Sequence, residues 1–229
     1  NPLLTSLMYT VVFGQIARIS TDGVPQFLYY MAGNTAWAYF STCLTSTSHT
    51  FTGNAHLFGK VYFPRLITPI TNVIYSLLSF VIQLVLLAVA MLIFGLRGTV
   101  IVPDVSIFIM PVLVLQMALL GLGVGIIISS ITTKYRDLSI LVGFGIHLWM
   151  YVTPVVYPIS QAASISESIS KIVMLNPVAP IVNNFRYIVL GCGSFDCFYW
   201  GISWIVTFVV LFIGILIFNR VEKTFMDTV

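Results

Sequence analysis

The stretch LITPITNVIYSLLSFVIQLVLLAVAMLIFGL, Leu66–Leu96, contains no charged residue. About 20 consecutive apolar residues are enough for a helix to cross the hydrocarbon core of a bilayer. The apolar run is continuous and does not alternate with polar residues, which favours a helix over a strand of a membrane β-barrel. The sequence therefore predicts that this segment is a membrane-spanning helix.

Four further runs lack Asp, Glu, Lys and Arg: Gly23–Gly59, Val105–Thr133, Leu138–Ser166 and Cys197–Asn219. Only 7% of the 229 residues are charged, and the mean hydropathy is +1.02. A soluble domain of this length carries about 25% charged residues, so lipid must be the main solvent of this chain. The opening residues are apolar as far as Ala17, and we expect this first helix to begin upstream of residue 1.

These runs predict an all-α membrane protein that forms a single transmembrane domain over residues 1–229. We expect six transmembrane helices, at residues 2–15, 27–51, 68–95, 105–130, 138–156 and 198–218.

Charge predicts the orientation, because Lys and Arg are enriched in cytoplasmic loops. One set of connections holds six cations against three anions, a net charge of +3, and we assign it to the cytoplasm: Lys60, Arg65, Lys134, Arg136, Arg220 and Lys223 against Asp137, Glu222 and Asp227. The other set is neutral: Arg18, Arg97, Lys171 and Arg186 against Asp22, Asp104, Glu167 and Asp196. Both termini are then cytoplasmic.

The link between the fifth and sixth helices, Pro154–Cys197, is long and rather apolar. Its prolines interrupt helices, and Asn176-Pro177 is typical of a helix start. We interpret the link as a re-entrant pair of short amphipathic helices in the outer leaflet; the alternative is a long surface loop. Cys192 and Cys197 are spaced for either a small disulfide loop or two free thiols.

Recognisable catalytic motifs are absent from the sequence. The glycine run GLGVG, Gly121–Gly125, lacks a following Lys, so close helix packing explains it better than phosphate binding. His49, His56 and His147 are isolated, and no metal-ligand spacing occurs. Ion-coupled transporters place charged residues inside the bilayer, and the charge-free runs offer none. We therefore expect no enzyme, and a partner as the energy source for any uphill transport. Interhelical hydrogen bonds account for the lone Gln83 and Gln116.

The predicted cytoplasmic link NAHLFGKVYFPRLITPI, Asn54–Ile70, mixes apolar and basic residues. Phe58 and Tyr62 lie between or beside the cations Lys60 and Arg65, where a simple solvated loop would be polar. A short helix along the membrane face that docks on a soluble partner fits this pattern. An ordinary cationic membrane anchor fits it equally well.

Five segments resemble the transmembrane subunit of type-2 ATP-binding-cassette exporters, in the branch that moves lipid-linked O-antigen and similar polysaccharides. They are LFGKVYFPRLITPI, TTKYRDLS, YVTPVVYP, LNPVAPIVNNFR and NRVEKTF, and the resemblance covers nearly the whole chain. The family pattern also has an N-terminal interface helix, which we expect upstream of residue 1.

The resemblance implies a homodimer in the bacterial cytoplasmic (inner) membrane that binds two ATPase subunits. ATP and Mg²⁺ would be bound by those partners, with no cofactor in this chain and no nucleic acid partner. It further implies a coupling surface that contacts the ATPase: Asn54, Leu57, Phe58, Lys60, Tyr62, Arg65, Lys134 and Arg136.

Aromatic rings offer flat faces on which sugar rings can slide, so we interpret three helix faces as the lining of a substrate channel. The predicted channel residues are Tyr9, Phe13, Tyr30, Asn34, Trp37, His147 and Tyr151. The alternative is that these rings pack against lipid or lie in interfacial belts. Two other functions stay open: an exporter of small lipids or drugs from the same superfamily, and a membrane scaffold without transport.

Overall fold

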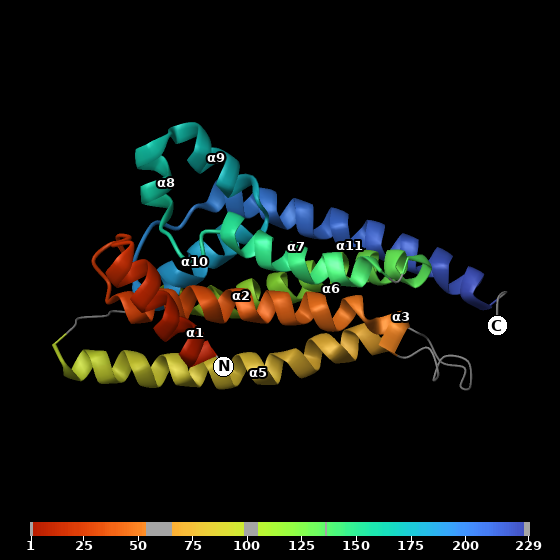
Figure 1. Cartoon of the computed structure of the whole chain (residues 1–229), viewed down its shortest axis with the longest axis horizontal. Coiled ribbons are helices and arrows are strands. Elements are labelled where there is room, and N and C mark those ends of the chain that lie inside the picture. The colour runs from red at the N-terminus through yellow and green to blue at the C-terminus, as the bar shows by residue number, and fades with distance from the viewer. Residues whose placement is uncertain (1, 54–65, 99–104, 136, 227–229) are drawn as a thin grey trace.

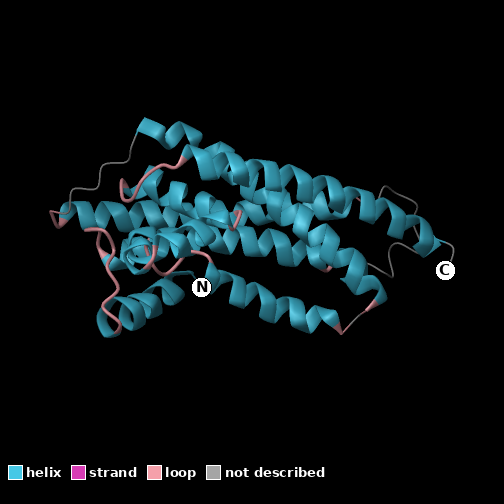
Figure 2. Cartoon of the chain, turned by 90° about the horizontal axis from the view of Figure 1, so that it is seen from above, coloured by secondary structure: helices cyan, strands magenta, loops and turns pink. Residues whose placement is uncertain are grey.

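The computed structural model describes residues 2–53, 66–98, 105–135 and 137–226, and every element described there is helical. The prediction of an all-α protein is therefore confirmed. Long helices lie side by side in a bundle (Figures 1 and 2). The long helices are α2 (Gln26–Ser48), α5 (Ile67–Leu96), α6 (Met110–Lys134) and α11 (Cys197–Met226).

The shorter elements complete the chain. They are α1 (Pro2–Tyr9) with its π-helical continuation η1 (Thr10–Ile16), α3 (Thr50–Gly53), the 3-10 turn η2 (Val105–Ile109), α7 (Leu138–Val152), α8 (Ile159–Ile165), α9 (Glu167–Leu175) and α10 (Val178–Leu190). Helices α8, α9 and α10 gather at the end of the bundle opposite α3 (Figure 1). Predicted helix bounds agree with the observed ones to within a few residues for most of the long helices. The helix predicted at 138–156 ends earlier, at Val152, because Thr153 precedes Pro154 and is extended at ψ 139°.

Three helices among the described residues are long and apolar enough to cross a membrane: Ile67–Leu96, Ser106–Thr133 and Cys197–Val221. Their outer faces carry exposed apolar side chains, as expected where lipid is the solvent. Shorter apolar helices cover Leu3–Ile16, Leu138–Val152 and Val178–Leu190. The chain is thus a multi-pass membrane protein, and the number of six crossings stays a prediction.

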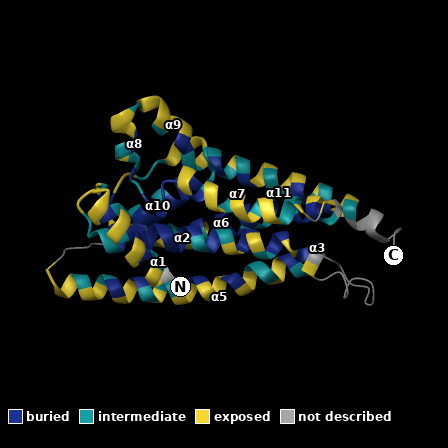
Figure 3. Ribbon diagram, viewed as in Figure 1, coloured by how far each residue is buried: buried dark blue, intermediate teal, exposed yellow. Residues whose placement is uncertain are grey.

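Helix α2 forms the centre of the bundle and packs against α1, α5, α6 and α10. It is buried over most of its length, whereas α5 shows alternating exposed and covered positions (Figure 3). The sequence of α2 contains Asn34, Thr35 and several tyrosines, and hydropathy alone does not mark α2 as a membrane span. Polar side chains belong inside a membrane protein, because lipid gives them no hydrogen-bond partner.

Glycines set the spacing of the central helices α2, α6 and α11. A Cβ placed on Gly121 would lie 2.8 Å from Cys43 Cβ, and one on Gly125 would lie 2.5 Å from Thr47 Cβ. On the opposite face of α6, a Cβ on Gly123 would lie 3.0 Å from the Leu211 backbone of α11. The predicted packing role of Gly121 and Gly125 is confirmed, because no larger residue fits these contacts.

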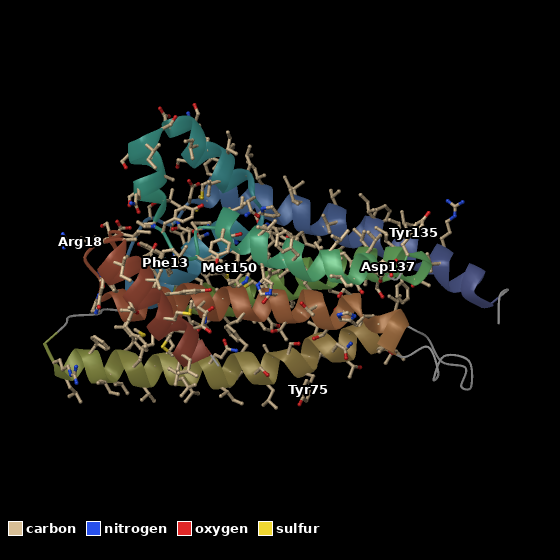
Figure 4. All side chains as sticks on the ribbon, viewed as in Figure 1. Phe13, Arg18, Tyr75, Tyr135, Asp137 and Met150 are labelled. Atoms are coloured by element: carbon tan, nitrogen blue, oxygen red, sulfur yellow. The ribbon has the colours of Figure 1, made fainter. Side chains whose placement is uncertain are left out.

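The two ends of the bundle separate the connections as the charge pattern predicts. Tyr135 and Asp137, between α6 and α7, lie at the same end as α3 and the C-terminus, whereas Arg18 lies at the opposite end with α8 and α9 (Figures 1 and 4). We call these the α3 end and the α8–α9 end. Which of them faces the cytoplasm stays a prediction.

The link between α7 and α11 holds three short helices rather than the expected two. Helices α8 and α9 form a hairpin, and a small apolar cluster of Val173, Met174 and Ala179 joins α9 to the start of α10. Helix α10 begins one residue after Pro177, close to the predicted start, and turns back into the bundle. Cys192 is buried and Cys197 is exposed, and both are free thiols.

Candidate functional site

The predicted channel residues of α1, η1 and α2 form a chain of ring contacts. The Tyr9 and Phe13 ring centroids are 5.7 Å apart, and Phe13 lies 6.4 Å from Tyr30. The Tyr9 hydroxyl donates a hydrogen bond to Met150 Sδ of α7 at 3.4 Å. The first helix therefore meets α7 through Tyr9 and Met150, close to the labelled Phe13 (Figure 4).

A second ring cluster joins α2 to α7. Trp37 lies 5.5 Å from Phe40 and 6.4 Å from Trp149, and Phe40 lies 5.3 Å from Trp149, between ring centroids. The sequence analysis did not select Phe40 or Trp149. Their spacing offered a signal, because Phe40 lies one turn from Trp37 on the same face of α2.

Burial divides the predicted channel residues into two groups. Tyr30, Asn34 and Trp37 are buried inside the protomer, and Tyr9 is nearly covered. His147 and Tyr151 are exposed on α7. Whether all seven residues line one route stays a prediction, since the route is expected between two copies of the chain.

Helix α7 presents an open face. Phe144, His147, Leu148 and Tyr151 recur at helical spacing and are all exposed. A Cβ placed on Gly143 or Gly145 of this helix would meet nothing within 4 Å. The face therefore combines bare backbone, apolar surface and the polar edges of two rings, a surface that can contact both the apolar and the hydroxyl groups of a sugar.

Asn176 connects the end of α7 to the start of α10. Trp149 Nε1 donates to Asn176 Oδ1 at 3.0 Å, and Asn176 Nδ2 donates to Thr153 Oγ1 at 2.9 Å. The backbone N–H of Val178 also donates to Asn176 Oδ1, at 3.2 Å, and so caps the new helix. The amide thus holds the two helices at a fixed angle. We call this contact set the Asn176 joint.

Arg186 of α10 forms a second joint, the Arg186 joint, deep in the bundle. Its Nη1 donates to Tyr29 Oη at 2.8 Å and to the Pro154 carbonyl at 2.6 Å, and its Nη2 donates to the Val155 carbonyl. The guanidinium carbon also lies 4.0 Å from the Tyr29 ring centroid, which favours a cation–π contact. Arg186 is only 2% exposed.

The burial of Arg186 corrects the sequence analysis, which counted it among the charges of an outer connection. No local signal marked this burial, because the carbonyls that accept from Arg186 belong to the segment TPVVYP, Thr153–Pro158, which is distant in the sequence. Its hydrogen bonds to two backbone carbonyls make Arg186 an anchor between α10 and the segment that follows α7.

Gln116 forms a third joint, between α6, α11 and the start of α10. Trp200 Nε1 donates to Gln116 Oε1 at 2.7 Å, and Gln116 Nε2 donates to Ser203 Oγ at 2.8 Å. Ser203 Oγ in turn donates to the Pro177 carbonyl at 2.6 Å. The predicted interhelical hydrogen bonds are confirmed for Gln116. For Gln83 they are not, because its buried Oε1 has no partner among the described residues.

The predicted coupling surface falls almost entirely outside the described residues. Lys134 is the last residue of α6, at the α3 end. The others lie in ranges that the structure does not describe: Asn54, Leu57, Phe58, Lys60, Tyr62, Arg65 and Arg136. Asp137 is the residue before α7, and its side chain makes no capping hydrogen bond to that helix. Within the described ranges, no group of three His, Cys, Asp or Glu side chains could hold a metal ion.

Similar proteins are known for almost the whole chain. An O-antigen export system permease protein, RfbA, of Klebsiella pneumoniae is 28% identical over 228 residues, which cover 99% of this chain and 84% of that protein. The RfbA of Myxococcus xanthus is 29% identical over 189 residues, which cover 82% of this chain and 69% of that protein. The family described as ABC-2 type transporter matches residues 1–190. This chain therefore belongs to the ABC-2 type transporter family of membrane proteins.

Proposed function

We propose that this chain is the membrane-spanning subunit of an ATP-driven exporter that moves a lipid-linked, O-antigen-like polysaccharide across the bacterial inner membrane. The observation that carries the proposal is the similarity along 99% of the chain to an O-antigen export permease. A second Klebsiella pneumoniae permease of the same name, 27% identical over the same length, supports it.

In this proposal α1 with η1, α2, α5, α6, α7 and α11 are the six crossings, and α8 to α10 form the re-entrant element in the outer leaflet. Both termini are cytoplasmic, so the α3 end faces the ATPase. Two copies of the chain form the transporter, and the route lies between them. The exposed α7 face supports this arrangement, because two polar rings, His147 and Tyr151, interrupt its apolar side chains.

The energy comes from two partner ATPase subunits, which bind ATP and Mg²⁺. Phe58 and Tyr62 are proposed to fill a groove of the ATPase, while Lys60, Arg65 and Arg136 meet its acidic residues or lipid phosphates. The glycine contacts between α2 and α6 would transmit a tilt from the α3 end, because helices packed this closely move as one body. The joints at Asn176 and Arg186 would then carry the tilt to α10.

Deletion of the gene in its host, followed by complementation, tests the proposal. The deletion strain should lose surface polysaccharide and accumulate the lipid-linked polymer inside, and the wild-type gene should restore export. The variants Phe58→Ala and Tyr62→Ala should restore expression without export, with ATP hydrolysis by the co-purified ATPase continuing. Unchanged surface polysaccharide together with new drug sensitivity would instead support an exporter of small molecules.

Co-purification separates transport from the scaffold alternative. A tagged version of the chain should bring down an ATPase subunit, and purified permease without it should hydrolyse no ATP. Recovery of the chain without any ATPase, in a strain with normal surface polysaccharide, would overturn the proposal.

A further inference from the structure

An apolar groove of about 750 Å³ lies at the α8–α9 end of the bundle, on the side of α5. Its walls come from four elements: α5 contributes Leu87, Ala88 and Met91, η2 contributes Ile107, α6 contributes Met110, and α10 contributes Val189. Every residue that lines it is apolar. A water molecule inside would find none of the polar side-chain partners that buried water needs.

The groove exists because α5 packs along α2 and is not packed along α6. Helix α5 packs along α2 but contacts α6 at few positions, so a gap is left beside its C-terminal half. Leu92 and Leu96, which also line the groove, are 68% and 90% exposed. The groove therefore opens on the outer surface of a helix that is long and apolar enough to span the membrane.

A cation lies directly beyond the open groove. Arg97 follows the lining residue Leu96 and ends α5, and it is exposed. No acidic side chain pairs with it within the part of the chain that the structure describes. Apolar surface at membrane depth followed by an arginine at the membrane boundary matches the two parts of a phospholipid, an acyl chain and a phosphate.

We propose that this groove binds the acyl chain of an anionic phospholipid, with its phosphate at Arg97. The acyl chain fills the gap and supplies the van der Waals contacts that α5 and α10 do not make with each other there. The acyl chain leaves one apolar surrounding for another, so selectivity comes from the charge: a basic residue near the surface favours anionic lipid by about 1 kcal/mol, or roughly fivefold. The bound lipid then contacts α10 at Val189, one turn after Arg186. The inference is independent of the cargo that the protein exports.

Photo-crosslinking in nanodiscs tests the proposal. The full-length chain is placed in phosphatidylcholine nanodiscs that contain phosphatidylglycerol with a diazirine on its acyl chain, and labelled peptides are identified by mass spectrometry. We expect labelling on α10 around Val189 and on η2 around Ile107, at positions that a lipid on the outer surface of α5 does not reach. Ala88→Trp should reduce this labelling severalfold by filling the groove. Val89→Trp, at the neighbouring exposed position outside the lining, should not.

The preference for an anionic headgroup is tested by comparison with the corresponding phosphatidylcholine probe. Phosphatidylglycerol should label the groove about fivefold more strongly, and Arg97→Gln should remove the difference. Equal labelling by both probes in the wild type, or full labelling of α10 in a folded Ala88→Trp variant, would overturn the proposal. Absent labelling combined with disulfide formation in Ala88→Cys, either with a cysteine placed in residues 99–104 or with a second copy, would assign the groove to protein instead.

Discussion

Helices α7 and α10 are close in length and in sequence position, yet they have opposite surroundings. Helix α10 carries Asn184 and Arg186 and is buried on nearly all sides, whereas α7 is almost wholly apolar and only Met150 is buried. In a water-soluble protein, the apolar helix would be buried and the helix with the polar residues would be exposed. In lipid, an apolar side chain gains little from burial, while a polar one must find a partner inside the protein. Polar residues in this chain therefore mark the fixed parts, and apolar surface marks the parts open to lipid or to a second copy.

The largest expected effect comes from breaking the anchor of α10. Arg186→Met should leave the Pro154 and Val155 carbonyls without donors, and each orphaned buried carbonyl costs about 1–3 kcal/mol. We expect a loss of about 2–6 kcal/mol in unfolding free energy and no export, measured by unfolding of the purified protein and by surface polysaccharide. Arg18→Met, which removes an exposed arginine at the same end, should change neither.

Gly33→Ala disturbs the Arg186 joint without removing the charge of the arginine. A Cβ on Gly33 would collide with Arg186 Nη2 and lie 2.8 Å from the Val155 carbonyl oxygen. The alanine variant should therefore behave like a weaker Arg186→Met. If both variants were as stable as the wild type, the buried guanidinium would not be what fixes α10.

A pair of glycines tests the contrast between covered and open helices. Gly125→Ala places a methyl group against Thr47 and should cost about 1–3 kcal/mol in unfolding free energy. Gly143→Ala on α7 meets nothing within 4 Å and should stabilise the helix by about 0.5–1 kcal/mol. Chemical denaturation of the purified variants measures both. A loss at Gly143 as large as that at Gly125 would mean that α7 is covered in the assembled protein.

The same contrast explains what the sequence could predict. Charge-free runs located the long helices, because hydropathy reports contact with lipid. The core was harder: α2 contains Asn34 and several Thr and Ser residues, and only the length of its charge-free run identified it. Helix α10 was missed as a buried element, since Arg186 and the neighbouring prolines are typical of a loop. Burial of such residues depends on carbonyls of a distant segment, Pro154 and Val155, that local patterns do not reveal.

Tyr151→Ala should have a small effect on stability and a clear effect on export. Tyr151 is 53% exposed on the open face of α7, so its removal should change the unfolding free energy by no more than about 0.5 kcal/mol. Export should fall if this face lines the route. Tyr75→Ala is the matched control, because Tyr75 is an exposed tyrosine of α5 that points away from the bundle (Figure 4). Equal export by the two variants would contradict the assignment of α7 to the route.

The smallest effect is expected on the α8–α9 hairpin, where the one ion pair of the described residues joins Glu167 Oε1 to Lys171 Nζ at 2.7 Å. The hydrogen bond and the charge of Lys171 lower the pKa of Glu167 below its ordinary 4.5. The pair therefore adds stability above that pH, and the contribution is lost as the pH falls through the lowered pKa. Both side chains are exposed, so water and salt screen the attraction.

Glu167→Gln should accordingly leave the melting temperature unchanged within error at pH 7 and pH 4. A clear drop at pH 7 that disappears at pH 4 would show that this pair holds the hairpin. That outcome would break the contrast between α7 and α10, because an exposed charge would then fix an element as firmly as the buried Arg186. The expected result would leave the hairpin dependent on its apolar contacts around Met174.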